Sequence, residues 1–170
     1  MGAPPEVIEA ARSCMSLVMA DGLWRTVGFR KRPRHGSLFQ RLRPHWRVAF
    51  EKAVLKELLI LLTAQRLAGA QLSATDLDAV LTIYVDGTGE PLWPVLGYPS
   101  REHGLQHLKG SIAEYLAAPL SDWPQRAIQR LAVDTVPDPQ LRARLLVGFI
   151  AMVRNLTALV VEWRSGATAG

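Results

Sequence analysis

Ten basic residues are concentrated in one fifth of the chain, between Trp24 and Lys56, and only Glu51 opposes them. Seven of the ten are arginines, whose planar guanidinium groups bind phosphates through paired hydrogen bonds. Neutralised phosphates release counterions, and this release drives the binding of basic proteins to nucleic acids. The density therefore predicts a surface that contacts the backbone of RNA or DNA. The residues expected to bind are Arg25, Arg30, Lys31, Arg32, Arg34, Arg41, Arg43, Arg47 and Lys52.

Aromatic residues are interleaved with these arginines, and such rings offer stacking surfaces for bases. They are Trp24, Phe29, Phe39 and Trp46, and two further hydrogen-bond donors, His35 and His45, lie among them. The plainer interpretation is a solvated basic loop, in which Arg47 and Glu51 form an i,i+4 surface pair. An acidic protein or an anionic membrane surface is the alternative to nucleic acid as the partner of these basic residues.

The remaining sequence has the opposite charge. The formal net charge is +5, whereas the segment from Trp24 to Lys56 alone contributes +9. Leu67 to Ser100 contains no lysine or arginine, and its acids are Asp76, Asp78, Asp86 and Glu90. This asymmetry predicts a second surface for a basic neighbour, either another subunit or a further copy of the chain, and a head-to-tail row of copies would follow.

Motifs for catalysis are absent: the sequence has no GxxxxGK[ST], GxSxG or HExxH. His103 and His107 have a spacing that suits a metal, but no third ligand is evident. Acids near Asp76 are typical of helix starts, and Cys14 lies in an apolar stretch typical of a buried thiol. We therefore predict a nonenzymatic protein with no catalytic residue, metal or cofactor.

Helical spacing dominates the pattern that must position these residues. Capping residues and helix breakers place expected helices at Pro4–Gly22, Pro44–Gly69, Ser73–Tyr84 and Asp138–Gly166. Two more are expected to begin at Ser100 and Ser121 and to include Tyr115 and Leu131 respectively. We expect a basic loop with one helical turn over 24–45, a loop or short hairpin over 85–99, and a frayed tail over 166–170. The predicted fold is an all-α, single-domain bundle of five or six helices spanning 1–170.

Neither a signal peptide nor a membrane span is expected. The most apolar stretch, Leu145 to Val161, carries Arg154 at its centre, which favours a buried helix over a membrane helix. A single cysteine is compatible with a reducing compartment. The sequence therefore predicts a cytoplasmic protein with no membrane partner.

In length, basicity and helical content the whole chain resembles the small helical subunits of multi-subunit CRISPR effector complexes. The run Arg30-Lys31-Arg32-Pro33-Arg34 is compatible with this resemblance of profile. The resemblance implies a noncatalytic subunit of a ribonucleoprotein complex in antiviral defence. Such a subunit contacts strand backbones beside other subunits. The resemblance assigns no role to any individual residue.

The predicted function is nonenzymatic binding of a nucleic-acid backbone within such a complex. The first competing hypothesis is a transcriptional regulator, because Lys56–Gly69, Ser73–Tyr84 and the loop over 87–97 imitate helix–turn–helix–wing. Its reading elements would be acidic, whereas a recognition helix is normally basic. The second is a protein–protein adaptor or assembly factor, and the third is an enzyme with an unrecognised site.

Overall fold

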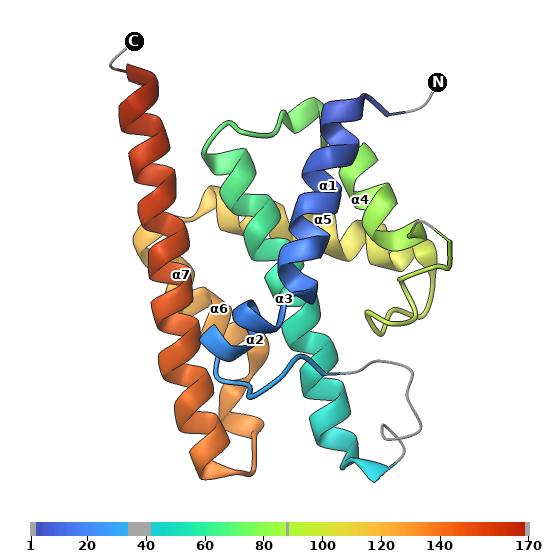
Figure 1. Cartoon of the computed structure of the whole chain (residues 1–170), viewed down its shortest axis with the longest axis vertical. Coiled ribbons are helices and arrows are strands. Elements are labelled where there is room, and N and C mark those ends of the chain that lie inside the picture. Colours follow the sequence, from blue (N-terminus) through green and yellow to red (C-terminus); the bar gives the residue numbers. More distant parts are fainter. Residues whose placement is uncertain (1–2, 34–41, 88, 169–170) are drawn as a thin grey trace.

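Seven α-helices make up most of the residues that the computed structural model describes, which are 3–33, 42–87 and 89–168 (Figure 1). They are α1 (Pro5–Met19), α2 (Asp21–Thr26), α3 (His45–Ala68), α4 (Leu77–Asp86), α5 (Arg101–Ala117), α6 (Trp123–Leu131) and α7 (Pro139–Thr168). Single 3₁₀ turns occur at Ala74–Asp76, Leu120–Asp122 and Val133–Thr135, and the described ranges contain no strand. The predicted all-α, single-domain fold is confirmed, with one or two more helices than expected.

Local capping chemistry sets several helix ends where the sequence places them. The Ser100 hydroxyl accepts the backbone N–H of His103 at 3.2 Å and opens α5. Asp138 accepts the N–H groups of the first turn of α7 through Oδ1, at 3.0 and 3.1 Å. Helix α3 begins directly after Pro44 and ends at Gly69. These boundaries are confirmed to within a residue.

Three expectations about helix boundaries are wrong. The first helix ends at Met19 and not at Gly22, which lies inside α2. Helix α2 lies partly in the expected loop over 24–45, because Trp24 is completely buried and fixes this segment to the core. Its indole N–H donates to the Val18 carbonyl at 2.6 Å. At the other end, α7 continues through Gly166 to Thr168, because Gly166 does not adopt the positive φ that ends helices at glycine. The rest of the expected frayed tail lies outside the described residues.

Helix α3 occupies the centre of the bundle and packs against α1, α5, α6 and α7 (Figure 1). Its segment from Leu58 to Leu62 is apolar on every side and almost wholly buried, as expected for the middle of a core. Helix α4 packs against α1 and α5. The segment over 89–99 consists of turns and bends and is anchored by buried Leu96 and Tyr98.

Helix α7 runs along one side of the bundle and is only partly covered (Figure 1). Leu145 and Phe149 are buried, whereas Val147 is 69% and Val161 54% exposed. By length and composition alone α7 is apolar enough to cross a membrane. In its most apolar stretch of 18 residues, 28% is buried inside the protein. The expectation of a buried helix is therefore wrong for its outer face.

Candidate nucleic-acid interface

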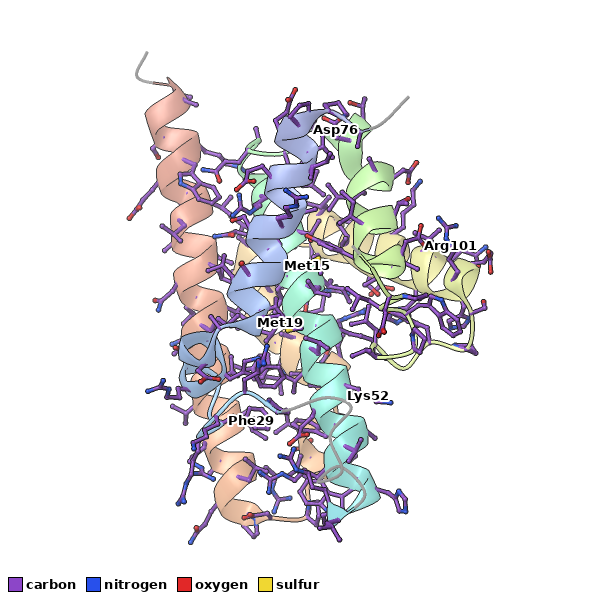
Figure 2. All side chains as sticks on the ribbon, turned by 45° about the vertical axis from the view of Figure 1, so that its right-hand side comes forward. Met15, Met19, Phe29, Lys52, Asp76 and Arg101 are labelled. Carbon is purple, nitrogen blue, oxygen red and sulfur yellow. The ribbon has the colours of Figure 1, made fainter. Side chains whose placement is uncertain are left out.

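A groove lies between α2 with the following segment to Pro33, the first turns of α3, and the start of α7. It consists of two adjoining hollows of about 740 and 550 Å³ that share Gly28, Phe29, Arg30 and Arg144. Figure 2 shows Phe29 in the lower part of the molecule, far from Asp76. We call these two hollows together the basic groove. Among the described residues its charged lining is Arg25, Arg30, Lys31, Arg32, Arg43, Arg47, Arg144 and one carboxylate, Glu51.

Six of the nine predicted binding residues line this groove: Arg25, Arg30, Lys31, Arg32, Arg43 and Arg47. Lys52 does not, because it lies about 140° around α3 from Arg47 at 100° per residue. It borders a separate hollow of about 570 Å³ with His45 and Lys56. Figure 2 shows Lys52 on the side of α3 away from Phe29. The remaining two predicted residues, Arg34 and Arg41, lie outside the described residues.

Arg144 belongs to the groove but was missed by the sequence analysis, because it lies in α7, far along the chain. Two glycines bring its helix against α2. A Cβ atom at Gly148 would lie 2.5 Å from the Thr26 carbonyl oxygen, and one at Gly28 would lie 2.9 Å from the Arg144 backbone. Gly28 also has a φ of +104°, which side chains rarely adopt. These glycines were the sequence signal for the contact, but nothing local identifies their partner.

Glu51 holds two of the groove arginines. Its side chain is only 2% exposed, and Arg43 donates from Nη1 to its two oxygens at 3.0 and 2.8 Å. Arg47 donates from Nε to Oε1 at 3.3 Å. The predicted i,i+4 pair of Arg47 and Glu51 therefore forms, but around a buried carboxylate and not on the surface. We call these three residues the groove cluster.

The aromatic residues of the basic segment do not offer the expected stacking surface. Trp24 is 0% and Phe29 5% exposed, and their rings pack edge to face with centroids 5.1 Å apart. Trp46 is half-buried against the core. Phe39 and His35 lie outside the described residues, and His45 borders the other hollow. Stacking by Trp24 and Phe29 is therefore excluded by their burial.

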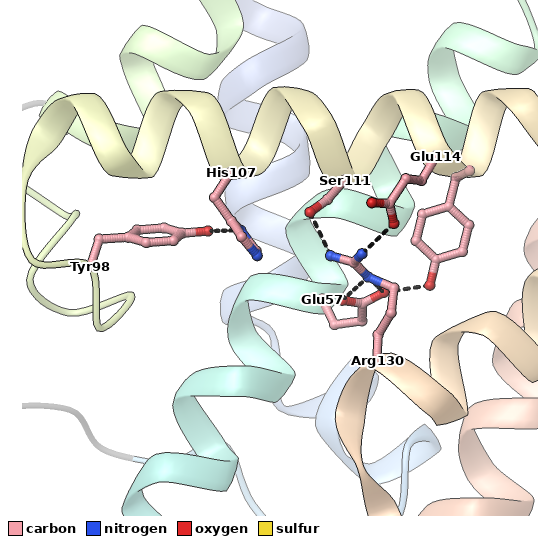
Figure 3. Close-up of polar contacts among 7 residues, drawn as sticks. Glu57, Tyr98, His107, Ser111, Glu114 and Arg130 are labelled. Atoms are coloured by element: carbon pink, nitrogen blue, oxygen red, sulfur yellow. Dashed lines mark hydrogen bonds and ion pairs between the residues drawn. The ribbon is translucent and has the colours of Figure 1, made fainter.

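A second carboxylate of α3, Glu57, is at the centre of a buried polar network that joins α3, α5 and α6 (Figure 3). Arg130 donates from Nε to both of its oxygens at 3.0 Å, and the Tyr115 hydroxyl donates to Oε1. Arg130 also donates to Ser111 Oγ at 2.5 Å and to Glu114 at 2.8 Å. We call these five residues the core network.

Burial dominates the electrostatics of the core network. It raises the pKa of Glu57 above its ordinary value, although Arg130 and Tyr115 oppose this shift. Burial also raises the pKa of the Tyr115 hydroxyl, and the neighbouring Glu57 carboxylate adds to the shift. Because every nitrogen of the Arg130 guanidinium already donates to a protein oxygen, the network connects helices and offers no free fork to a ligand.

The weaker candidates of the sequence do not assemble a site among the described residues. No group of three His, Cys, Asp or Glu side chains with metal-binding geometry occurs there. His107 forms a 2.8 Å hydrogen bond with the Tyr98 hydroxyl through Nδ1, and burial lowers its pKa. Cys14 is buried, as expected.

The acidic region is partly neutralised in three dimensions. Asp86 pairs with Arg101 at 2.6 Å and Asp78 with Lys109 at 2.8 Å. Both cations lie after the acidic region in the sequence. The net charge of residues 67–100 is therefore more negative than that of the surface that these residues form together with Arg101 and Lys109. A basic neighbour would compete with both cations for the carboxylates.

No protein-family model, curated protein or solved structure matches the chain.

Proposed function

We propose that this protein binds the phosphate backbone of a nucleic acid in the basic groove, without catalysis. The observation that carries the proposal is the convergence of seven cationic side chains from three parts of the chain on one groove with a single carboxylate. Five of these cations have no salt-bridge partner among the described residues. Such an excess of charge is stabilised when phosphates replace the repulsion with attraction.

Recognition in this groove is of the backbone and not of base sequence. The aromatic rings beside it are buried, and its lining offers guanidinium and ammonium donors, which contact phosphates whatever the base. No residue in the described lining of the groove distinguishes RNA from DNA. We expect single strands of either kind to bind with similar affinity and with little preference for sequence.

Salt dependence tests this proposal directly. Binding of a labelled 20-nucleotide single strand is measured by fluorescence anisotropy between about 50 and 300 mM salt. If each of the seven cations contacts a phosphate of its own, the log–log slope is about −5, from ~0.7 per phosphate for single strands, and it is about −4 if two of them share one phosphate. Absence of binding at the lowest salt concentration contradicts the proposal and favours the adaptor hypothesis.

A pair of matched double variants tests the location. Arg30→Ala with Lys31→Ala removes two charges from the groove, whereas Lys52→Ala with Lys56→Ala removes two from the hollow across α3. We expect the first pair to lower the slope by about 1.4 and the second to leave it nearly unchanged. Equal losses would show that net charge matters and the groove does not. Circular dichroism checks that both variants remain helical.

The finer part of the proposal is that the bound strand belongs to a multi-subunit nucleoprotein complex such as a CRISPR effector. The resemblance of the whole chain to the small helical subunits of such complexes supports it. Partner proteins, including further copies of the chain, would then lie beside the groove. Purification of the tagged protein from its native cells is expected to yield a nucleic acid with a stoichiometric protein set. Recovery of the protein alone would contradict this part only.

The regulator hypothesis receives little support from the geometry. Helix α4, which would be the recognition helix, packs against α1 and α5, and the charged side chains on it are Asp78 and Asp86. The phosphates that flank a major groove would repel both carboxylates. Sequence-selective binding that survives loss of Arg30 and Lys31 would nevertheless restore this hypothesis.

A further inference from the structure

We propose that the groove cluster is a preorganised clamp for one phosphate of the bound strand, in which Glu51 is a positioning residue that fixes Arg43 and Arg47. The inference rests on the proposed function and adds a defined anchor point to it. The other groove cations would contribute charge, whereas this cluster would contribute geometry. It is the only place in the described lining of the groove where a carboxylate fixes a cation.

Glu51 is buried in the wall of the groove. A carboxylate that is 2% exposed is costly to desolvate unless it is paired and hydrogen-bonded. Both partners come from the wall of the groove: Arg43 donates to both oxygens and Arg47 donates to one. Glu51 therefore restricts two long side chains that would otherwise sample many rotamers.

The guanidinium groups of Arg43 and Arg47 retain N–H donors that Glu51 does not use. Arg43 uses Nη1, and Arg47 uses Nε, to reach Glu51. A guanidinium has five N–H donors, and in the described part of the chain the other donors of these two groups have no protein acceptor. Both side chains line the groove and remain 31% and 45% exposed. The unused donors therefore serve a ligand in the groove.

The groove cluster has a net charge of only +1. Two guanidiniums and one carboxylate leave a single positive charge, so the cluster attracts phosphate but adds little to non-specific electrostatics. Its contribution to affinity comes from orientation, because a fixed fork loses less rotamer entropy for each hydrogen bond that it forms. The other cations of the groove, which are Lys31 and four arginines, contribute mainly charge and little orientation.

This leads to a test in which charge and geometry predict opposite results. Glu51→Gln raises the net charge by one, so electrostatics alone predicts tighter binding of the labelled single strand. The clamp predicts weaker binding, about fivefold, because the charge-assisted bonds that orient Arg43 and Arg47 are lost. Unchanged or tighter binding by a folded Glu51→Gln variant overturns the clamp and leaves the proposed function intact.

Two further variants keep the test decisive if Glu51→Gln does not fold. Arg43→Lys and Arg47→Lys retain the charge but lack the planar fork. The clamp predicts that each weakens binding by several fold, whereas Arg30→Lys, at a groove arginine that does not pair with Glu51, has little effect. Equal behaviour of the three substitutions overturns the clamp. If the unmodified protein does not bind the strand at all, the proposed function itself fails, and that result is distinct from either outcome.

A double-mutant cycle tests whether Glu51 acts through the arginines. In a background with Arg43→Ala and Arg47→Ala, Glu51→Gln is expected to have no weakening effect, because there is no fork left to orient. A fivefold loss that persists in this background would show that Glu51 affects binding by another route, and the clamp would be wrong. Thermal melting of each variant separates these effects from instability.

Discussion

Helix α3 carries two buried glutamates that arginines hold in different ways. Glu51 is 2% and Glu57 5% exposed at the side chain, and they lie about 120° apart around the helix. In the core network Arg130 is 18% exposed and all of its nitrogens donate to protein oxygens. In the groove cluster both arginines are more exposed and retain donors. The same residue types thus connect helices in one place and present donors to a groove in the other.

The difference shows that an arginine–glutamate pair has no fixed role. What decides the role is the number of donors that the surrounding helices leave unused. Helices α5 and α6 supply Ser111, Tyr115 and Glu114 around Arg130, so the network closes on itself. The groove side of α3 faces more cations, which cannot accept hydrogen bonds from a guanidinium.

The strongest way to break this comparison is to remove Arg130. Arg130→Ala leaves the Glu57 charge buried without its main partner, and we expect it to lower the free energy of unfolding by about 3–5 kcal/mol. Arg47→Ala, which removes a half-exposed partner of Glu51, is expected to cost under about 1 kcal/mol. Chemical denaturation measures both. Similar losses would contradict the assignment of the two clusters to different roles.

A glycine next to the groove tests whether its walls are rigid. Gly148→Ala places a methyl group 2.5 Å from the Thr26 carbonyl, so α2 must move from α7. We expect a loss of about 1–3 kcal/mol of stability together with weaker strand binding. Gly110→Ala is the matched control, because nothing lies within 4 Å of the added atom. A Gly148→Ala variant that binds normally would show that the contact of α2 with α7 does not shape the groove.

Removing Arg144 sharpens the comparison from the groove side. Arg144→Ala is expected to leave stability unchanged and to lower the salt slope of strand binding by about 0.7. Arg154→Ala, at an exposed arginine further along the same helix and outside the groove, serves as its control. Equal effects of the two substitutions would mean that α7 contributes only general charge.

The smallest expected effect concerns pH. Burial lowers the pKa of His107 below 6.5, so the unfolded chain binds a proton there more readily than the folded protein does. Stability is therefore expected to fall as the pH falls from about 6.5 towards the folded pKa. His107→Gln removes this contribution, whereas His103→Gln, on the same helix but without the hydrogen bond to the Tyr98 hydroxyl, is the control. Thermal melts between pH 5 and 8 that do not differ between the variants would contradict the expectation.

Local chemistry explains which features could be predicted from the sequence. Ser100, Asp138 and Gly69 act on backbone groups within a few residues. The helix ends at these residues therefore follow from the local sequence alone. The apolar run from Leu58 to Leu62 likewise identifies the centre of the core. The prediction for α2 failed because the surrounding arginines obscure the single buried residue, Trp24, that fixes it.

An all-α chain with its basic residues concentrated near the amino end follows from the order of the amino acids, since helical periodicity and charge density are local properties. Only the tertiary structure decided which cations share a surface. It placed Arg144 beside α2 through two glycine contacts, turned Lys52 to the far flank of α3, and buried the rings of Trp24 and Phe29. The physical reason is that side-chain proximity depends on how helices pack and rotate, and residues distant in the chain set that packing.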